Sequence, residues 1–138
     1  MIGATGRHQI ALVQAGTNAV VGYQVRADGT LLQQSSYATN QAATCWIARD
    51  GDLLFASNAG SATETTLRLS NYGTLTALGN TATDAGTVDA AASGRNLYVQ
   101  TGANGVVDEY AIGSDGALTM IGSVTVAGAA GGEGIAVG

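Results

Sequence analysis

The feature that most constrains this chain is an internal repeat of about 44 residues. Three segments align, and their glycines are 44 and 43 residues apart: Asp28-Gly29-Thr30-Leu31, Tyr72-Gly73-Thr74-Leu75 and Asp115-Gly116-Ala117-Leu118. A second segment, Gly51-Asp52-Leu53-Leu54-Phe55, returns 43 residues later as Gly94-Arg95-Asn96-Leu97-Tyr98, and Gly6-Arg7-His8-Gln9-Ile10 is a weaker early copy. A period in the low forties with short strands is typical of one four-stranded blade of a β-propeller.

Within each copy, apolar residues alternate before the turn and a strand follows it. Val21, Tyr23 and Val25 illustrate the alternation, which indicates strands with one buried face. Glycine permits the positive φ that a tight hairpin needs. The 21 glycines and the absence of proline favour many short strands, and helical spacing is nowhere sustained. The sequence therefore predicts an all-β fold of four-stranded antiparallel blades.

The predicted strands do not begin and end with a whole blade. With strands lettered from the blade centre outward, the order is b-c-d, a-b-c-d, a-b-c-d, a. The first b-strand is His8–Gln14, and the last a-strand is Ile135–Val137. We expect one partial-propeller domain over 1–138, with blade boundaries, taken from the repeat, near 5–49, 50–92 and 93–138. Strand exchange at the termini would complete the unfinished blade.

The charged residues exclude several classes of function. The net charge is −5, all five basic residues are arginine, and lysine is absent, which excludes P-loop phosphate binding and Schiff-base chemistry. One histidine and one cysteine (His8 and Cys45) cannot build a Cys/His zinc site. Five scattered arginines cannot neutralise a run of phosphates, so nucleic acid is not an expected partner. We expect no metal and no cofactor.

The sequence shows no apolar run long enough for a signal peptide and no stretch of 18 apolar residues. We therefore expect a soluble, cytoplasmic protein without a membrane partner.

Four residues are candidates for ligand binding at the centre of the predicted propeller. Trp46 and Asp89 occupy the same repeat position on inner strands, with Gly134 third. Trp46 could stack on a sugar ring while Asp89, Arg49 or Glu133 bonds its hydroxyls. The structural alternatives stay open: Trp46 would pack between blades, and Asp89 would cap backbone amides of the neighbouring blade.

Other polar motifs favour structural roles. Asp50-Gly51-Asp52 lacks the further carboxylates of a calcium loop and lies where each blade turns. Adjacent residues of a strand point to opposite faces, so Asp108 and Glu109 are not a catalytic pair. Cys45 is expected to be a small buried residue.

The sequence resembles the lactonase-type β-propellers, which include 6-phosphogluconolactonase-like proteins and muconate-cyclase relatives. The resemblance rests on these segments: Gln41-Ala42-Ala43-Thr44-Cys45-Trp46-Ile47, 50–60, Asn96-Leu97-Tyr98-Val99, Gly132-Glu133-Gly134-Ile135-Ala136-Val137 and the hairpins above. It covers roughly residues 18–138 and corresponds to the family's C-terminal blades. The resemblance implies the fold; none of the family's catalytic residues can be matched here.

Three functions follow as hypotheses. In the first, the chain is an assembly module that closes into a ring and presents its central channel to a small polar ligand or partner; a homodimer would give six blades. In the second, it is a lactone hydrolase of the 6-phosphogluconolactonase type, acting on a sugar lactone. In the third, suggested by Trp46 alone, it is a sugar-binding lectin. Inner-strand positions are mostly Ala, Val, Ile and Gly, which favours the first.

Overall fold

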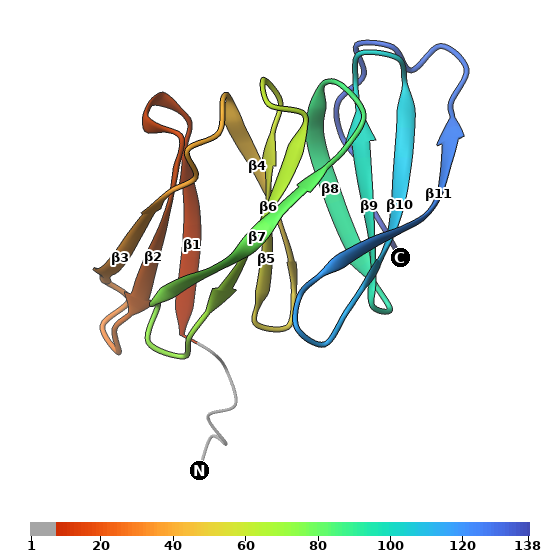
Figure 1. Cartoon of the computed structure of the whole chain (residues 1–138). Coiled ribbons are helices and arrows are strands. Elements are labelled where there is room, and N and C mark those ends of the chain that lie inside the picture. The colour runs from red at the N-terminus through yellow and green to blue at the C-terminus, as the bar shows by residue number, and fades with distance from the viewer. Residues whose placement is uncertain (1–7) are drawn as a thin grey trace.

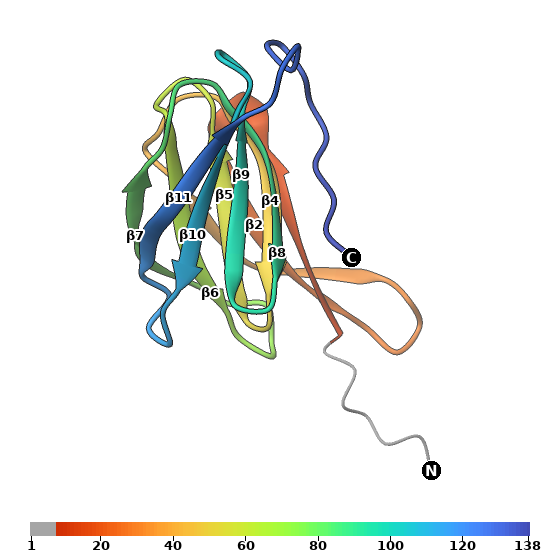
Figure 2. The same ribbon diagram turned by 90° about the vertical axis from the view of Figure 1, so that its right-hand side faces the viewer.

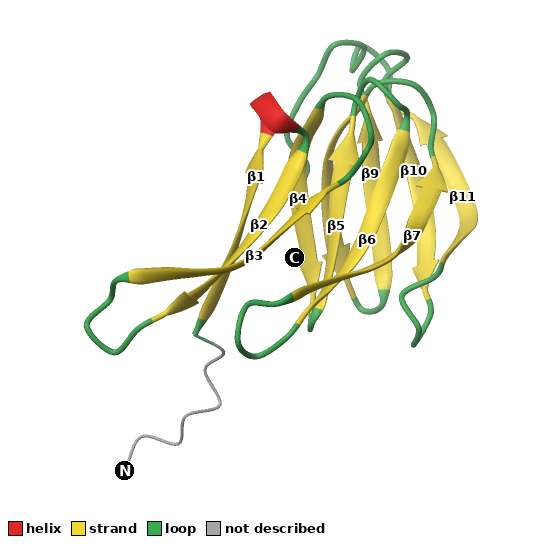
Figure 3. Cartoon of the chain, turned by 60° about the vertical axis from the view of Figure 1, so that its left-hand side comes forward, coloured by secondary structure: helices red, strands yellow, loops and turns green. Residues whose placement is uncertain are grey.

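Tight turns and alternating apolar residues fold the chain into successive hairpins. The computed structural model describes residues 8–138. In this range eleven strands form three antiparallel sheets, and the one helical element is the 3₁₀ turn η1 (Ala15–Thr17) (Figure 3). The all-β prediction is confirmed. No helix within the described range is long and apolar enough to cross a membrane.

The three sheets stand side by side like blades of a fan (Figure 1). Blade 1 has three strands, whereas blades 2 and 3 have four each. Blade 1 comprises β1 (Gln9–Gln14), β2 (Ala19–Val25) and β3 (Leu31–Ala38). Blade 2 comprises β4 (Thr44–Asp50), β5 (Leu53–Asn58), β6 (Thr63–Leu69) and β7 (Leu75–Ala82). Blade 3 comprises β8 (Thr87–Ser93), β9 (Asn96–Thr101), β10 (Val106–Ile112) and β11 (Leu118–Thr125).

Consecutive strands pair within each blade, as in a meander. The register of blade 2 matches that of blade 3: Trp46 pairs with Ser57 where Asp89 pairs with Gln100. In both blades a bulge precedes this pair on the first strand. The sequence repeat is therefore also a structural repeat.

The apolar core lies between blades, and only blade 2 has a neighbouring blade on both faces within residues 8–138. One cluster joins blade 1 to blade 2, and its buried members are Val20, Leu54, Ala56, Leu67 and Leu69. The other joins blade 2 to blade 3, and its buried members are Ala48, Leu53, Phe55, Ala90, Leu97, Val99, Tyr110 and Ile112. Alternating residues of β5 serve the two clusters, since Leu54 faces blade 1 and Phe55 faces blade 3.

The turn glycine of blade 2 packs directly on blade 1. Gly73 has a φ of +88°, and its carbonyl oxygen would lie 2.0 Å from a Cβ added to Gly22 on β2. Ser35 reinforces this contact, because its hydroxyl donates to the Gly73 carbonyl at 2.8 Å and accepts from the Leu75 amide at 3.0 Å. The hairpin turn thus fixes how blade 2 sits on blade 1.

The predicted order b-c-d, a-b-c-d, a-b-c-d is confirmed, but the final a-strand is not. Residues 126–138 contain no strand, and Ile135–Val137 forms no ladder with any strand of residues 8–138. The repeat boundaries near 50 and 93 fall at the turns that follow β4 and β8, so they separate the first strand of a sheet from its second. Residue 5, the boundary of the first repeat, and Arg7 lie outside the described residues.

Gly22→Ala should destabilise the chain strongly. A methyl group at Gly22 would overlap a backbone oxygen held by the β-turn, so the two blades would have to separate. We expect a loss of about 3 kcal/mol in the free energy of unfolding, as for overpacked cores, measured by urea denaturation. Gly16→Ala is the control, because nothing lies within 4 Å of its Cβ position. Equal stability of the two variants would contradict this account of blade packing.

Candidate functional site

The inner strands β4 and β8 lie next to each other at the centre of the fan, where a propeller has its channel. Their closeness is visible at Cys45, whose Sγ lies 3.8 Å from each of the carbonyl oxygens of Thr87 and Val88. Cys45 is exposed as a whole residue, so the expectation of a small buried residue is wrong; its sulfur nonetheless packs against backbone carbonyls of β5 and β8. Burial of the sulfur among these carbonyls raises the pKa of the thiol.

Asp89 on β8 holds the C-terminal segment in place. It is 3% exposed; one carboxylate oxygen accepts from the Ala90 amide at 2.7 Å, and the other accepts from the Ile135 amide at 2.9 Å. The segment leading to the C-terminus runs beside the inner strands without forming one (Figure 2). Asp89 therefore does accept from backbone amides, but they belong to its own strand and to the C-terminal segment and not, as expected from the sequence, to the neighbouring blade. A carboxylate with both oxygens accepting from amides is poorly placed to activate water.

The other three candidate residues are exposed. Trp46 on β4 keeps 48% of its surface accessible, so packing between blades does not account for it. The Arg49 Nε donates to the carbonyl of Gly51 at 2.8 Å, across the turn between β4 and β5. Glu133 lies two residues before Ile135, in the segment that Asp89 anchors. Among the described residues no hydrogen bond or ion pair joins Trp46, Arg49, Asp89 and Glu133 to one another.

The sequence analysis missed a buried acid between blades 2 and 3. Glu64 on β6 is 0% exposed, the Ser57 hydroxyl donates to its Oε1 at 2.5 Å, and its Oε2 has no partner. Burial raises the pKa of Glu64 to about 8, and the nearby Asp89 carboxylate adds to the shift. The sequence repeat indicates that this acid is buried, because Glu64 occupies the position that valine holds in the other two copies, Val20 and Val107.

Further polar groups are buried along the same blade interface. Asp108 on β10 accepts from the Asp84 amide at 2.8 Å, and burial raises the pKa of its carboxyl. Tyr110 on the same strand donates its hydroxyl to the Ala82 carbonyl at 2.8 Å, and burial raises the pKa of Tyr110 to about 12. These bonds tie β10 to the end of β7 and to the loop after it, so they have a structural role.

A groove of about 280 Å³ lies between blade 1 and blade 2. Its walls come from β1 and from β4–β5: Gln9, Ile10, Ala11, Ile47, Ala48, Arg49 and Leu54. Blade 1 begins with the second strand of the repeat, so this groove lies along the edge where blades 2 and 3 carry their inner strands. The groove is mostly apolar, with Arg49 as its charged side chain.

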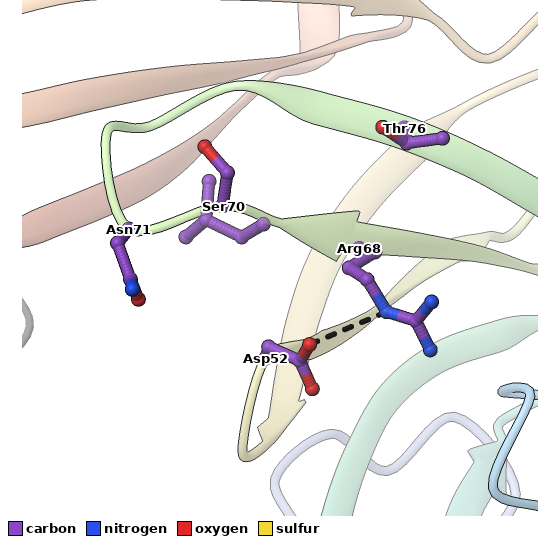
Figure 4. A pocket seen from close by; sticks show the side chains of 6 residues that line it. Asp52, Arg68, Ser70, Asn71 and Thr76 are labelled. Atoms are coloured by element: carbon purple, nitrogen blue, oxygen red, sulfur yellow. Dashed lines mark ion pairs between the residues drawn. The ribbon is translucent and has the colours of Figure 1, made fainter.

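A second hollow, of about 380 Å³, lies by the turns of blade 2 (Figure 4). It contains an ion pair between Arg68 Nε and Asp52 Oδ2 at 3.3 Å, with side chains 42% and 49% exposed. An ion pair this accessible contributes little to stability because water screens it. Asp52 belongs to the turn between β4 and β5, which confirms the turn reading of Asp50-Gly51-Asp52.

Solved structures with a similar fold include three whose names denote lactonases. A candidate 6-phosphogluconolactonase of Bacteroides fragilis is 24% identical, with a TM-score of 0.78 over 86% of this chain and 36% of its own. One from Bacteroides uniformis is 18% identical, with a TM-score of 0.76 over 92% of this chain and 42% of its own. The periplasmic gluconolactonase of Pseudomonas aeruginosa is 20% identical, with a TM-score of 0.74 over 89% of this chain and 38% of its own.

No protein-family model matches the sequence, and no curated protein matches it either. The chain spans about two fifths of the length of the solved structures that it resembles. The resemblance to the lactonase-type propellers is therefore confirmed as a likeness of fold.

The buried acid gives the fold a pH-dependent stability. The folded-state pKa of Glu64 is about 8 against a usual 4.5, so between these values the folded chain holds a proton that the unfolded chain releases. Raising the pH from 5 to 8 should lower the free energy of unfolding, by up to about 1.4 kcal/mol per pH unit. Glu64→Gln should reduce this dependence, since the amide stays neutral while the contribution of Asp108 remains; urea denaturation across the pH range measures it.

Glu133→Gln is the matched control, because the same change is made on an exposed side chain. It should follow the wild-type pH profile. Parallel profiles for wild type and Glu64→Gln would show that the carboxyl at Glu64 is not the group responsible.

Proposed function

We propose that this chain is a lactonase-like propeller module that closes into a ring with a second copy of itself. Two features of the described residues support the proposal: blade 1 has three strands and not four, and the C-terminal segment forms no ladder. Within residues 8–138, β1 pairs with β2 alone, so none of these residues fills the inner-strand position of blade 1. At the other end, Asp89 holds the Ile135 amide beside the inner strand β8, which is the position of the next inner strand.

The groove between blades 1 and 2 is the place where such a strand would bind. It runs along β1, whose open edge presents unpaired backbone groups. Open edges of this kind pair with another strand when one is supplied. Ile135–Val137 of a second copy carries alternating apolar residues that suit a groove of this composition. The exchange would give blade 1 the four strands that blades 2 and 3 already have.

The number of blades favours two copies. Three blades per chain and two chains give six, whereas three chains give nine, and closed propellers have about four to eight. A two-fold arrangement also makes the two junctions identical, as point-group symmetry requires.

We propose further that the channel of this ring binds a small polar ligand and does not catalyse its conversion. The exposed Trp46 and Arg49 on β4 offer a stacking surface and a cation, and the exposed Glu133 offers an acceptor. Sugars and sugar acids suit this set, because their rings stack on indole and their hydroxyls bond to charged side chains.

A lactone hydrolase is the second candidate, and the names of the neighbouring structures favour it. Lactone hydrolysis needs a group that activates water, and Asp89 accepts from two amides instead. We therefore rank it below the binding module.

The first test is the mass in solution. Light scattering of the 138-residue chain at micromolar concentration should give about 27 kDa, twice the 13.6 kDa of one chain. A stable 13.6 kDa species under these conditions would refute self-assembly.

The second test removes one backbone donor from the exchanged segment. Ala136→Pro lacks the N–H that a ladder with β1 would use. The dissociation constant of the dimer should therefore rise about tenfold or more above that of the wild type. Ala136→Val keeps the donor and should stay dimeric. Loss of dimers in both variants, or in neither, would contradict strand exchange at Ile135–Val137.

The third test addresses the channel. Trp46 is the one tryptophan of the chain, so its fluorescence reports directly on ligand binding. Gluconate should change the emission of the wild type, and Trp46→Phe should bind about tenfold more weakly when binding is followed by calorimetry. Turnover of 6-phosphogluconolactone above background that Asp89→Ala abolishes would instead favour the hydrolase.

A further inference from the structure

We infer that the outward faces of blade 1 and blade 3 dock on each other between two copies, in the same register as the two blade interfaces within one chain. This inference rests on the proposed ring closure and names the surface that closes it. Each blade turns one face toward the preceding blade and the other toward the following one. Within residues 8–138 no blade packs on the preceding-side face of blade 1 or on the following-side face of blade 3, and only the C-terminal segment lies against part of the latter.

The apolar side chains of blade 1 that lack a neighbour match buried side chains in the other blades. Leu12 on β1 corresponds in the repeat to Ala56 on β5 and Val99 on β9. Those two residues are fully buried against a preceding blade, whereas Leu12 is 46% exposed. Ile10 follows the same rule, since it is 38% exposed while its counterparts Leu54 and Leu97 are 2% and 0% exposed. Blade 1 thus carries a blade-facing surface that no blade of this chain covers.

The turn glycines give an independent sign of the missing neighbour. Gly73 and Gly116 are buried, and a Cβ added to them would lie 2.9 Å from Tyr23 and 3.2 Å from Thr66 on the preceding blades. Gly29, the third member of the set, has the same left-handed φ of +83° but nothing within 4 Å of its Cβ position. The turn of blade 1 thus has the same backbone conformation as the turns of blades 2 and 3, but no preceding blade lies against it.

Tyr23 indicates a hydrogen bond that would form when the two faces dock. It occupies the repeat position of Tyr110, whose hydroxyl donates to the carbonyl of Ala82, the last residue of β7. The corresponding last residue of β11 is Thr125. In the closed ring the Tyr23 hydroxyl therefore donates to the Thr125 carbonyl of the second copy.

One charged side chain on each outward face complements the other; Asp28, the carboxylate in the same turn as Arg26, is already engaged by the amide and hydroxyl of Thr30. Arg26 begins the turn of blade 1 that contains Gly29. On blade 3, Glu109 occupies the position that Gly22 and Thr66 hold on blades 1 and 2, which is where the following turn packs. Docking in the shared register therefore brings the turn with Arg26 onto Glu109. This match of a cation with a carboxylate favours a second copy as the occupant of each face.

The following-side face of blade 3 also has an unsatisfied polar group. Gln100 on β9 is 9% exposed, and its Oε1 is buried without a partner. It lines a hollow of about 260 Å³, together with Val107 and Ile135. Val107 corresponds to Val20 and Glu64, which are fully buried by a following blade. A blade laid on this face would cover Val107 as well.

The test separates the docking surface from self-assembly as such. Leu12→Glu places a charge on the outward face of blade 1, at a position already exposed in the single chain, so the monomer should keep its circular dichroism and unfolding midpoint. Docking would bury that charge without a partner. The dissociation constant of the dimer should therefore rise about 100-fold or more above that of the wild type. Tyr72→Glu is the control, because Tyr72 is 70% exposed and lies on the turn of blade 2.

A charge exchange tests the register. Arg26→Glu alone and Glu109→Arg alone should each weaken the dimer by about tenfold, and the double variant should return to within about threefold of the wild type. Equilibrium analytical ultracentrifugation at two salt concentrations measures all four proteins, and the differences should shrink at high salt.

Each outcome decides between the proposals. A dissociated, folded Leu12→Glu variant and a restored double variant support the docking surface. If wild type is a dimer but Leu12→Glu remains one, the copies meet elsewhere, and this inference fails while self-assembly stands. If wild type is a monomer at 100 µM, both proposals fail, and the outward faces belong to further blades of another polypeptide segment.

Discussion

The burial of apolar side chains between neighbouring blades is the constraint on which this structure depends. A single blade is a twisted sheet with apolar residues on both faces, so it needs a blade on each side. Blade 2 meets this requirement, and the two core clusters divide its strands so that Leu54 serves one side and Phe55 the other. Blades 1 and 3 each meet it on one side only. Everything we propose about assembly follows from these two faces.

The same packing explains how a carboxyl group with one unpaired oxygen is buried inside this small chain. Glu64 lies where the other repeats have valine, and the closeness of blade 3 removes water from its carboxyl. A neutral carboxylic acid loses much less hydration on burial than a carboxylate does, so its pKa rises. Asp89, in contrast, is buried beside amide donors, which supply the hydrogen bonds that water would otherwise provide. Two acids a short distance apart thus have different roles because their hydrogen-bond partners differ.

The lactonase-like fold and the proposed binding role are compatible, because function in a propeller depends on the residues of its channel and not on the blades that frame it. Here the channel-side positions combine an exposed indole and exposed charges with a carboxylate committed to the backbone. Closing the ring would bring two copies of this set around one channel. A ligand would then contact residues from both chains, and binding and assembly would be linked.

The sequence by itself determined the blade count, the strand order and the turns, because period-2 alternation and recurring turn glycines are local signals that survive weak identity. It offered a backbone-capping role for Asp89, but not the amides concerned, because the position of the C-terminal segment beside β8 is a tertiary feature. It did not determine that Trp46 and Cys45 are exposed, nor that Ile135–Val137 stays unpaired, because these depend on which strand lies alongside. Only the tertiary structure decided that Glu64 is isolated from water and that Gly29 lacks the contact its counterparts make, since burial belongs to the packing of two blades and not to either strand alone.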